Sequence, residues 1–183
     1  MDSPSFRRAT PDDVERIAEI HVAAWRAAYR GLIDDAALDD RTVAKRIAQW
    51  REVVEGDAFP AHAVYVAEVD REIKGFSQVG PSDDPDASVE PTFHVYALYL
   101  DPAERGRGLG TALLDHVLRE AASSGYTLTT LYVLIENDGA RRFYERHGWE
   151  AEPDIVTECL GDGTKAPQVR YRKRLQAQSA ATP

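Results

Sequence analysis

The stretch from Leu100 to Leu114 combines features that could bind an anion at the start of a helix. It reads LDPAERGRGLGTALL: an apolar strand end, then three closely spaced glycines, two arginines and a helical apolar pattern. The first turn of a helix presents unpaired N–H groups and a positive dipole end, and glycines let a ligand approach them closely. A plain turn is the alternative, but it seldom needs three glycines, and the arginines would repel one another without an anion between them. The residues concerned are Arg105, Gly106, Arg107, Gly108 and Gly110.

The glycine cluster alone does not identify the anion. Thr111 stands where the dinucleotide-binding fingerprint has its third glycine. No Gly-Lys-Ser/Thr sequence closes the stretch, so it is not a Walker A loop either. We therefore predict a phosphate site of another kind.

Length and composition indicate one ordinary globular domain, since the chain has 183 residues, of which 43% are hydrophobic and 29% charged. We expect the domain to span residues 1–175 and a flexible C-terminal tail to follow over 176–183. The net charge of −9 argues against a nucleic-acid partner and favours a basic substrate such as an amine.

The cysteine count and the hydropathy pattern predict a cytoplasmic protein. Cys159 is the single cysteine, so no internal disulfide forms, which fits a reducing compartment. No apolar run approaches membrane-spanning length, and the start MDSPSF lacks the basic and apolar regions of a signal peptide. We therefore expect no membrane partner.

The first half of the chain predicts a strand, two helices and a β-hairpin. Residues 6–10 form a strand candidate, and Thr10 then reads as the cap of a helix that runs to about Tyr29. A second helix covers about 43–54. The stretch 62–80 reads as two strands around a turn at Asp70 and Arg71, and a polar loop follows over 81–91.

The second half predicts a parallel strand–helix–strand unit and a closing hairpin. The strands cover 92–100 and 126–135, with a helix from Leu109 to Ser123 between them. Asn137 caps the next helix, and closing strands at 149–153 and 168–175 flank a loop over 161–167. The predicted fold class is a mixed α/β sheet with helices on both faces.

The chain resembles the GNAT superfamily of acyl-CoA-dependent N-acyltransferases. RGRGLG matches its Arg/Gln-x-x-Gly-x-Gly/Ala signature, and LYLDP stands at the expected distance before it. Asn137, Tyr144 and the HGW turn match the family's Asn-x₆-Tyr-x₃-Gly arrangement, and the element order agrees from Phe6 to Leu175. The resemblance implies a GNAT-like fold and identifies the anion as the pyrophosphate of coenzyme A, with acetyl-CoA as cosubstrate.

The resemblance also implies a set of cofactor-binding residues. Backbone groups at the end of the strand, where sheet pairing splays apart in this family, pair with the pantetheine arm, and an N–H near Leu100 contacts the developing oxyanion. Asn137 contacts the same arm; a helix N-cap is the compatible alternative. The set is Leu98, Tyr99, Leu100, Arg105, Gly106, Arg107, Gly108, Leu109, Gly110, Thr111, Asn137 and Tyr144.

Two residues match catalytic positions of the family. Tyr144 matches the tyrosine that protonates the thioester sulfur, and a core aromatic is the alternative. His94 stands where several members carry the base; it has the same strand parity as Tyr96 and Leu98, and a strand histidine without a catalytic task is the alternative. A histidine base predicts that the rate rises with pH near its ordinary pKa of ~6.5.

The acceptor site is implied only in outline. The early helices wall this site in the family, and the first helix carries His21, Trp25 and Tyr29. Trp25 and Tyr29 are the suggested substrate-binding residues beside Tyr96, although core packing explains Trp25 equally well. No histidine shows metal-ligand spacing, so no metal is predicted. Three alternating arginines near the C-terminus read as a charged edge or solvated face. They are Arg170, Arg172 and Arg174.

The predicted function is transfer of acetyl from acetyl-CoA to a primary amine of a small molecule or peptide, by direct attack in a ternary complex. The first alternative is a non-catalytic acyl-CoA-binding sensor or interaction module, which would need neither Tyr144 nor His94. The second is a nucleotide-binding regulatory domain, which would have no use for LYLDP and Asn137 at these spacings. The acceptor and the oligomeric state stay open, although dimers are common in the family.

Overall fold

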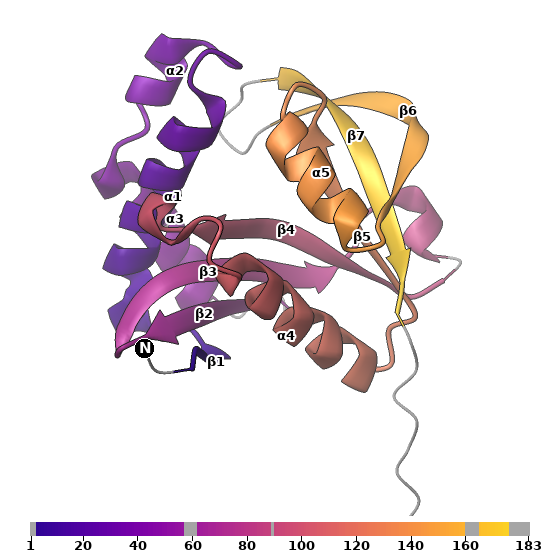
Figure 1. The fold of residues 1–183 in the computed structure, drawn as a ribbon, viewed down its shortest axis with the longest axis horizontal. Helices are drawn as coiled ribbons and strands as arrows, with labels where there is room; N and C mark the ends of the chain where they lie inside the picture. Colours follow the sequence, from indigo (N-terminus) through magenta and orange to yellow (C-terminus); the bar gives the residue numbers. More distant parts are fainter. Residues whose placement is uncertain (1–2, 57–61, 89, 160–164, 176–183) are drawn as a thin grey trace, which may run out of the picture.

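The computed structural model describes residues 3–56, 62–88, 90–159 and 165–175, and its elements are labelled in Figure 1. The strands are β1 (Ser5–Arg8), β2 (Ala63–Val69), β3 (Glu72–Pro81), β4 (Thr92–Leu100), β5 (Leu128–Leu134), β6 (Glu150–Cys159) and β7 (Lys165–Arg174). The α-helices are α1 (Val14–Tyr29), α2 (Asp35–Asp39), α3 (Val43–Glu55), α4 (Leu109–Ser123) and α5 (Asp138–Arg146). Short 3₁₀ helices cover Pro11–Asp13, Pro85–Ser88 and Pro102–Glu104.

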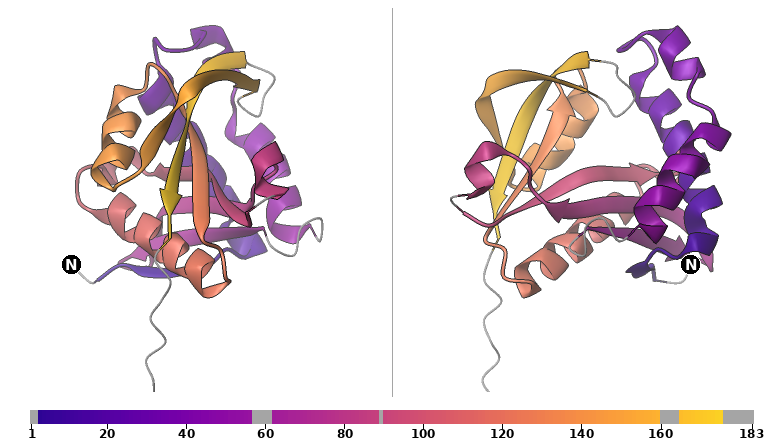
Figure 2. Two further views of the ribbon diagram at one scale, coloured as in Figure 1. Left: turned by 90° about the vertical axis from the view of Figure 1, so that its right-hand side faces the viewer. Right: turned by 180° about the vertical axis from the view of Figure 1, so that it is seen from behind.

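The strands form a mixed sheet in the order β1-β2-β3-β4-β5-β7-β6. β4 and β5 are parallel, and the other neighbouring pairs are antiparallel. One core cluster packs α4 and α5 against the sheet, and a second cluster packs α1 and α3 against its other face. Figures 1 and 2 show the two groups of helices on opposite sides. The predicted mixed α/β fold is confirmed.

Local sequence signals account for most element boundaries. Thr10 and Asp13 form a capping box before α1, and the Thr42 side chain accepts a hydrogen bond from the N–H of Lys45 at the start of α3. The predicted hairpin turn has Asp70 at φ 52° and Arg71 at φ 66°, as a two-residue turn of the primed type requires. Within the described residues, no helix is both long and apolar enough to span a membrane.

The structure differs from the prediction at three elements, α2, β6 and β7. The chain forms α2, a short helix capped by the Asp34 side chain, which was not predicted from the sequence. β6 is longer than expected, and β7 begins at Lys165 because residues 165–167 pair with the end of β6, with Pro167 opposite Thr157. The predicted loop over 161–167 is therefore wrong at its end, where residues 165–167 belong to β7. Residues 161–164 and the expected tail over 176–183 lie outside the described residues.

A bulge in β4 corrects the predicted strand parity. β4 pairs with β3 through Gln78 opposite Ala97 and Val79 opposite Val95, so Tyr96 is an extra residue on β4. Val95 packs in the α4 cluster, whereas Ala97 packs in the α1 cluster two positions later. Leu98 contacts the α4 cluster, so the expectation that His94 and Leu98 share one face is wrong.

β4 and β5 separate after a short paired segment. Thr92, Phe93 and His94 pair with residues 128–130, and beyond these residues β4 and β5 do not pair with each other. β5 continues instead against β7, and the two halves of the sheet diverge at this point (Figures 1 and 2). The sheet therefore splays at the C-terminal end of β4, as the family resemblance implied.

Candidate active site at the splayed strands

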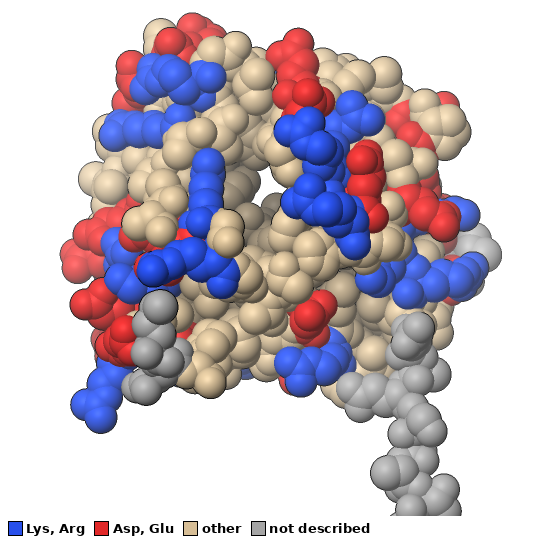
Figure 3. All heavy atoms as spheres, viewed as in Figure 1, with Lys and Arg blue, Asp and Glu red and all other residues tan. Residues whose placement is uncertain are grey.

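Two cavities meet where β4 and β5 separate. The first, the loop cleft, has a volume of about 790 Å³ and is lined by the glycine-rich loop, α1 and α5. The second, the α3 cavity, has a volume of about 730 Å³ and lies against α3 and the 82–85 loop. Both cavities are lined by Tyr29, Val95, Tyr96, Ala97, Tyr99 and Tyr132. Figure 3 shows the molecule hollowed between the helices at its left and α5, with basic side chains on both sides of the hollow.

The glycine-rich loop leaves a run of backbone donors available to a ligand. Gly106 and Gly108 have φ of +77° and +86°, and a Cβ built on either would meet nothing within 4 Å. Backbone conformation, not packing, therefore requires glycine at both positions. Gly108 is the N-cap of α4, and within the described chain no N–H from residue 106 to residue 111 donates to a protein acceptor. This arrangement fits an anion at the start of the helix.

The two loop arginines have protein partners. Arg105 donates to the carbonyl of Ala24 at 3.2 Å and lines the loop cleft. Arg107 pairs with Glu104 at 3.1 Å, and its side chain is 53% exposed. The expectation that these arginines need an anion between them is therefore wrong. The loop cleft is also lined by Arg146 in the last turn of α5, which was not among the predicted site residues.

Ten of the twelve predicted cofactor-binding residues line the loop cleft. They are Leu98, Tyr99, Leu100, Arg105, Gly106, Gly108, Gly110, Thr111, Asn137 and Tyr144. Arg107 does not line it, and Leu109 is 6% exposed within the α4 core cluster, so only its N–H is a candidate contact. The Asn137 side chain accepts a hydrogen bond from the N–H of Ala140 at 3.1 Å, which confirms it as the N-cap of α5.

Tyr144 lines the loop cleft from α5. Its side chain packs in the α4 cluster, with its ring centroid 5.6 Å from that of Trp149, so it is a core aromatic as well as a cleft residue. Burial raises its pKa, and the nearby Tyr29 hydroxyl raises it further. Tyr144 is therefore protonated at neutral pH and holds a proton that it can donate.

His94 lines the α3 cavity from β4. It is 7% exposed, and its Nδ1 lies 2.8 Å from the Thr130 hydroxyl. Burial lowers the pKa of His94 to about 4, so the ring is neutral at physiological pH. The sequence expectation of a pKa near ~6.5 is therefore wrong, because desolvation disfavours the charged ring.

Acidic residues line the end of the α3 cavity that holds His94. The Tyr132 hydroxyl donates to Asp84 at 2.7 Å, and the Ser82 hydroxyl donates to Asp84 at 2.9 Å. Arg170 is 12% exposed and lies 3.1 Å from Asp84 and 2.8 Å from Asp86, with Glu152 at 3.3 Å. Arg170 therefore ties the loop to β7, so for this arginine the predicted charged edge or solvated face is wrong.

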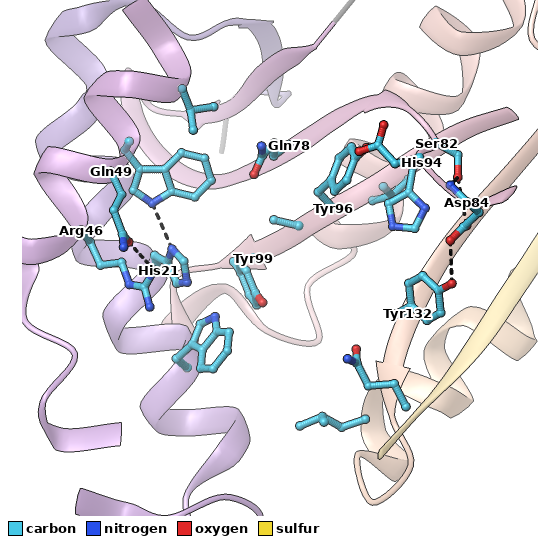
Figure 4. Close-up of a pocket in the computed structure, with 18 of the residues that line it drawn as sticks. His21, Arg46, Gln49, Gln78, Ser82, Asp84, His94, Tyr96, Tyr99 and Tyr132 are labelled. Carbon is cyan, nitrogen blue, oxygen red and sulfur yellow. Dashed lines mark hydrogen bonds between the residues drawn. The ribbon is translucent and has the colours of Figure 1, made fainter. Parts of the chain in front are cut away.

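The opposite end of the α3 cavity is aromatic and basic. The predicted substrate-binding residues Trp25, Tyr29 and Tyr96 all line this cavity. His21 and Arg46, which the predicted site did not include, line it too. Figure 4 shows His21 and Arg46 beside α1 and α3, and Tyr96 beside His94 at the other end, with Tyr99 between the two ends. Within the described part of the chain, no cluster of His, Cys, Asp and Glu could hold a metal.

We predict that acid destabilises the protein through two buried histidines. Burial lowers the pKa of His21 to about 3 and that of His94 to about 4. Between pH ~6.5 and ~4 the unfolded chain binds protons that the folded protein does not, so the free energy of unfolding falls by about 1.4 kcal/mol per pH unit for each histidine. Denaturant unfolding at a series of pH values measures this slope. The variant His94→Gln should reduce the slope by about 1.4 kcal/mol per pH unit, and an unchanged slope in that variant would contradict the buried neutral state.

A family profile and several known N-acetyltransferases match most of this chain in sequence. The acetyltransferase (GNAT) family profile matches residues 14–149. An uncharacterized N-acetyltransferase of Methanocaldococcus jannaschii is 29% identical over 85% of this chain, which spans 64% of that protein. An uncharacterized N-acetyltransferase of Archaeoglobus fulgidus is 30% identical over 76% of this chain and 88% of that protein.

Solved structures show the same fold. PaiA N-acetyltransferase from Thermoplasma acidophilum, in complex with coenzyme A, has a TM-score of 0.74 at 18% identity and covers 94% of this chain and 99% of its own. YncA from Salmonella typhimurium, with its cofactor acetyl-CoA, has a TM-score of 0.65 at 20% identity and covers 99% of both chains.

Proposed function

The chain belongs to the acetyltransferase (GNAT) family of N-acetyltransferases, and we propose that it transfers acetyl from acetyl-CoA to a primary amine of a small molecule or peptide by direct attack within a ternary complex. One observation carries this proposal: the loop cleft and the α3 cavity meet at the splay of β4 and β5. A thioester reaching the splay from one side and an amine reaching it from the other would place the reacting atoms together.

The loop cleft suits coenzyme A. The free N–H groups of residues 106–111 offer donors to a pyrophosphate at the N-terminus of α4, and Arg105 and Arg146 add positive charge. Beyond His94, the edge of β4 that faces β5 is unpaired, so its backbone groups could pair with the amides of the pantetheine arm.

The proposed reaction needs one proton acceptor and one proton donor. The amine nitrogen attacks the thioester carbonyl, the C–N bond forms, and the C–S bond then breaks. Tyr144 gives its proton to the departing thiolate, and a backbone N–H near Leu100 stabilises the oxyanion. His94, directly or through water, takes the proton that the amine loses. The protonated state of Tyr144 and the neutral state of His94 both support these roles.

We predict that the pH profile of the reaction lacks a histidine limb at ~6.5. His94 acts as a base only when neutral, and burial lowers its pKa to about 4. The fall in activity that protonation of His94 causes is therefore expected as the pH drops through about 4. His94→Ala should lower turnover by about tenfold at neutral pH, below the usual range for general bases because so weak a base is a poor acceptor. Turnover against pH, with one saturating acceptor, measures both effects. An inflection near ~6.5 that disappears in His94→Ala would contradict the low pKa.

A screen of amines with acetyl-CoA separates the enzyme from a non-catalytic acyl-CoA-binding module. Release of the CoA thiol that depends on an amine, together with an acetylated product in the mass spectrum, supports transfer. Binding of acetyl-CoA without release in the presence of any amine would favour the binding module.

A further inference from the structure

We propose that the acceptor is an amine that also carries a carboxylate, and that Arg46 and His21 bind this carboxylate at the α3 end of the α3 cavity. This inference rests on the proposed function and specifies its substrate class. Both side chains line the cavity, and each is mostly buried, with Arg46 7% and His21 8% exposed. A buried cation in a cavity wall is suited to a charged group on the ligand.

Arg46 supplies the charge. It lies on α3, and one of its N–H groups donates a hydrogen bond to the Gln49 side chain. A guanidinium has five N–H donors in a planar fork, a geometry that matches the two oxygens of a carboxylate. Gln49 also lines the cavity, so Arg46 is oriented by a neighbour at the wall.

His21 supplies a second donor beside it. The Nδ1 atom of His21 accepts a hydrogen bond from the Trp50 indole N–H at 3.0 Å, so in the neutral ring the proton is on Nε2. That Nε2–H is buried and has no hydrogen-bond partner within the described residues. Buried donors are normally satisfied, so this unmatched N–H near a guanidinium is available to an acceptor that the ligand supplies.

The far end of the cavity is lined by carboxylates, of which Asp84 pairs with Arg170 while Asp83 does not. Asp83 and Asp84 line it beside His94, and the Tyr96 hydroxyl lies 3.4 Å from Asp83. Of the residues shared with the loop cleft, Tyr99 lies between the two ends in Figure 4, whereas Tyr96 and Tyr132 lie at the acidic end. An amine at the splay therefore has acidic groups on one side and Arg46 on the other. This polarity favours an amino acid over a polyamine, whose further cations would meet Arg46.

Matched acceptors test the charge requirement. We would compare glycine, β-alanine, γ-aminobutyrate and phenylalanine with their carboxamides and with the amines that lack the carboxyl group. The parent enzyme should acetylate at least one acid with a kcat/KM about tenfold or more above its amide, the range expected when a hydrogen-bonded charge is removed. Amides or plain amines that react as well as every acid would overturn the inference and leave the proposed function standing.

The variant Arg46→Met tests the residue. It should lower kcat/KM for the preferred acid by about tenfold or more and change that for its amide by less than about threefold. Arg51→Met is the matched control, because Arg51 is on the same helix, is 60% exposed and pairs with Glu55 outside the cavity. Should Arg46→Met not fold, Arg46→Lys replaces it and should lose part of the preference. Equal losses for acid and amide would contradict a role in binding the carboxylate.

A binding measurement keeps the two proposals separate. If no acid, amide or amine in the panel is acetylated, the proposed function fails for these acceptors. Calorimetry with the N-acetylated acids in the presence of coenzyme A then decides the inference alone. Binding that Arg46→Met removes supports the carboxylate site, and no binding overturns it.

Discussion

Gly108→Glu is expected to abolish acetyl-CoA binding while the protein stays folded. Gly108 caps α4 at a φ of +86°, and a Cβ built there would meet no protein atom within 4 Å. The glutamate side chain would instead occupy the space over the free N–H groups of the loop and bring a negative charge to the place we assign to the pyrophosphate. For the parent, a hundredfold excess of acetyl-CoA over its dissociation constant should add about 2.7 kcal/mol to the free energy of unfolding.

Gly125→Glu is the matched control for this prediction. Gly125 follows the other end of α4 at a φ of +87°, and a Cβ on this residue would likewise meet nothing within 4 Å. Both variants should lose a similar amount of stability, about 1 kcal/mol or more, because each places a non-glycine residue at positive φ. Only Gly108→Glu should lose the thermal shift with acetyl-CoA. A folded Gly108→Glu protein that keeps the full shift would show that the anion binds elsewhere.

Tyr144→Phe is expected to lower turnover by about a hundredfold with little effect on folding or cofactor binding. The substitution keeps the ring that packs against Trp149 and removes the hydroxyl that we assign to the departing thiolate. A hundredfold loss corresponds to about 2.7 kcal/mol of transition-state stabilisation. Steady-state turnover with a confirmed acceptor, under conditions where chemistry limits the rate, measures it.

Tyr65→Phe controls for the loss of a buried tyrosine hydroxyl. Tyr65 is 6% exposed in the same core cluster, and its hydroxyl contacts Glu120, away from both cavities. Turnover should stay near the parent value in this variant. Equal turnover in Tyr144→Phe and the parent would leave Tyr144 as a core aromatic only.

Local signals in the sequence were sufficient to predict the bounds of β4 and α4, the elements on both sides of the glycine-rich loop. β4 and α4 have the bounds that apolar patterning predicted, 92–100 and 109–123, because each has a clear period and clear end signals. α2 has a capping aspartate, Asp34, but its five residues are too few to show a helical period. The bulge at Tyr96 was equally hidden, because counting alternate residues assumes that no residue is inserted.

The residues of the candidate site could be predicted where a sequence motif includes them. They could not be predicted where contacts between distant parts of the chain determine their position or their pKa. The glycine-rich loop and Tyr144 both line the loop cleft, as the family resemblance implied. The pKa of His94 depends on burial, and the ion pairs of Arg170 depend on a loop more than eighty residues away in sequence. Arg46 and His21 belong to no motif, and only their meeting in one cavity wall suggests a role.

Two-substrate kinetics test the central claim, direct transfer between substrates that meet at the splay. Initial rates measured at several concentrations of acetyl-CoA and of a confirmed acceptor should give intersecting lines in double-reciprocal plots. Intact-protein mass spectrometry of the enzyme with acetyl-CoA alone should show no added acetyl group. Parallel lines together with an acetylated enzyme would mean that the acetyl group passes through the protein, which contradicts direct attack.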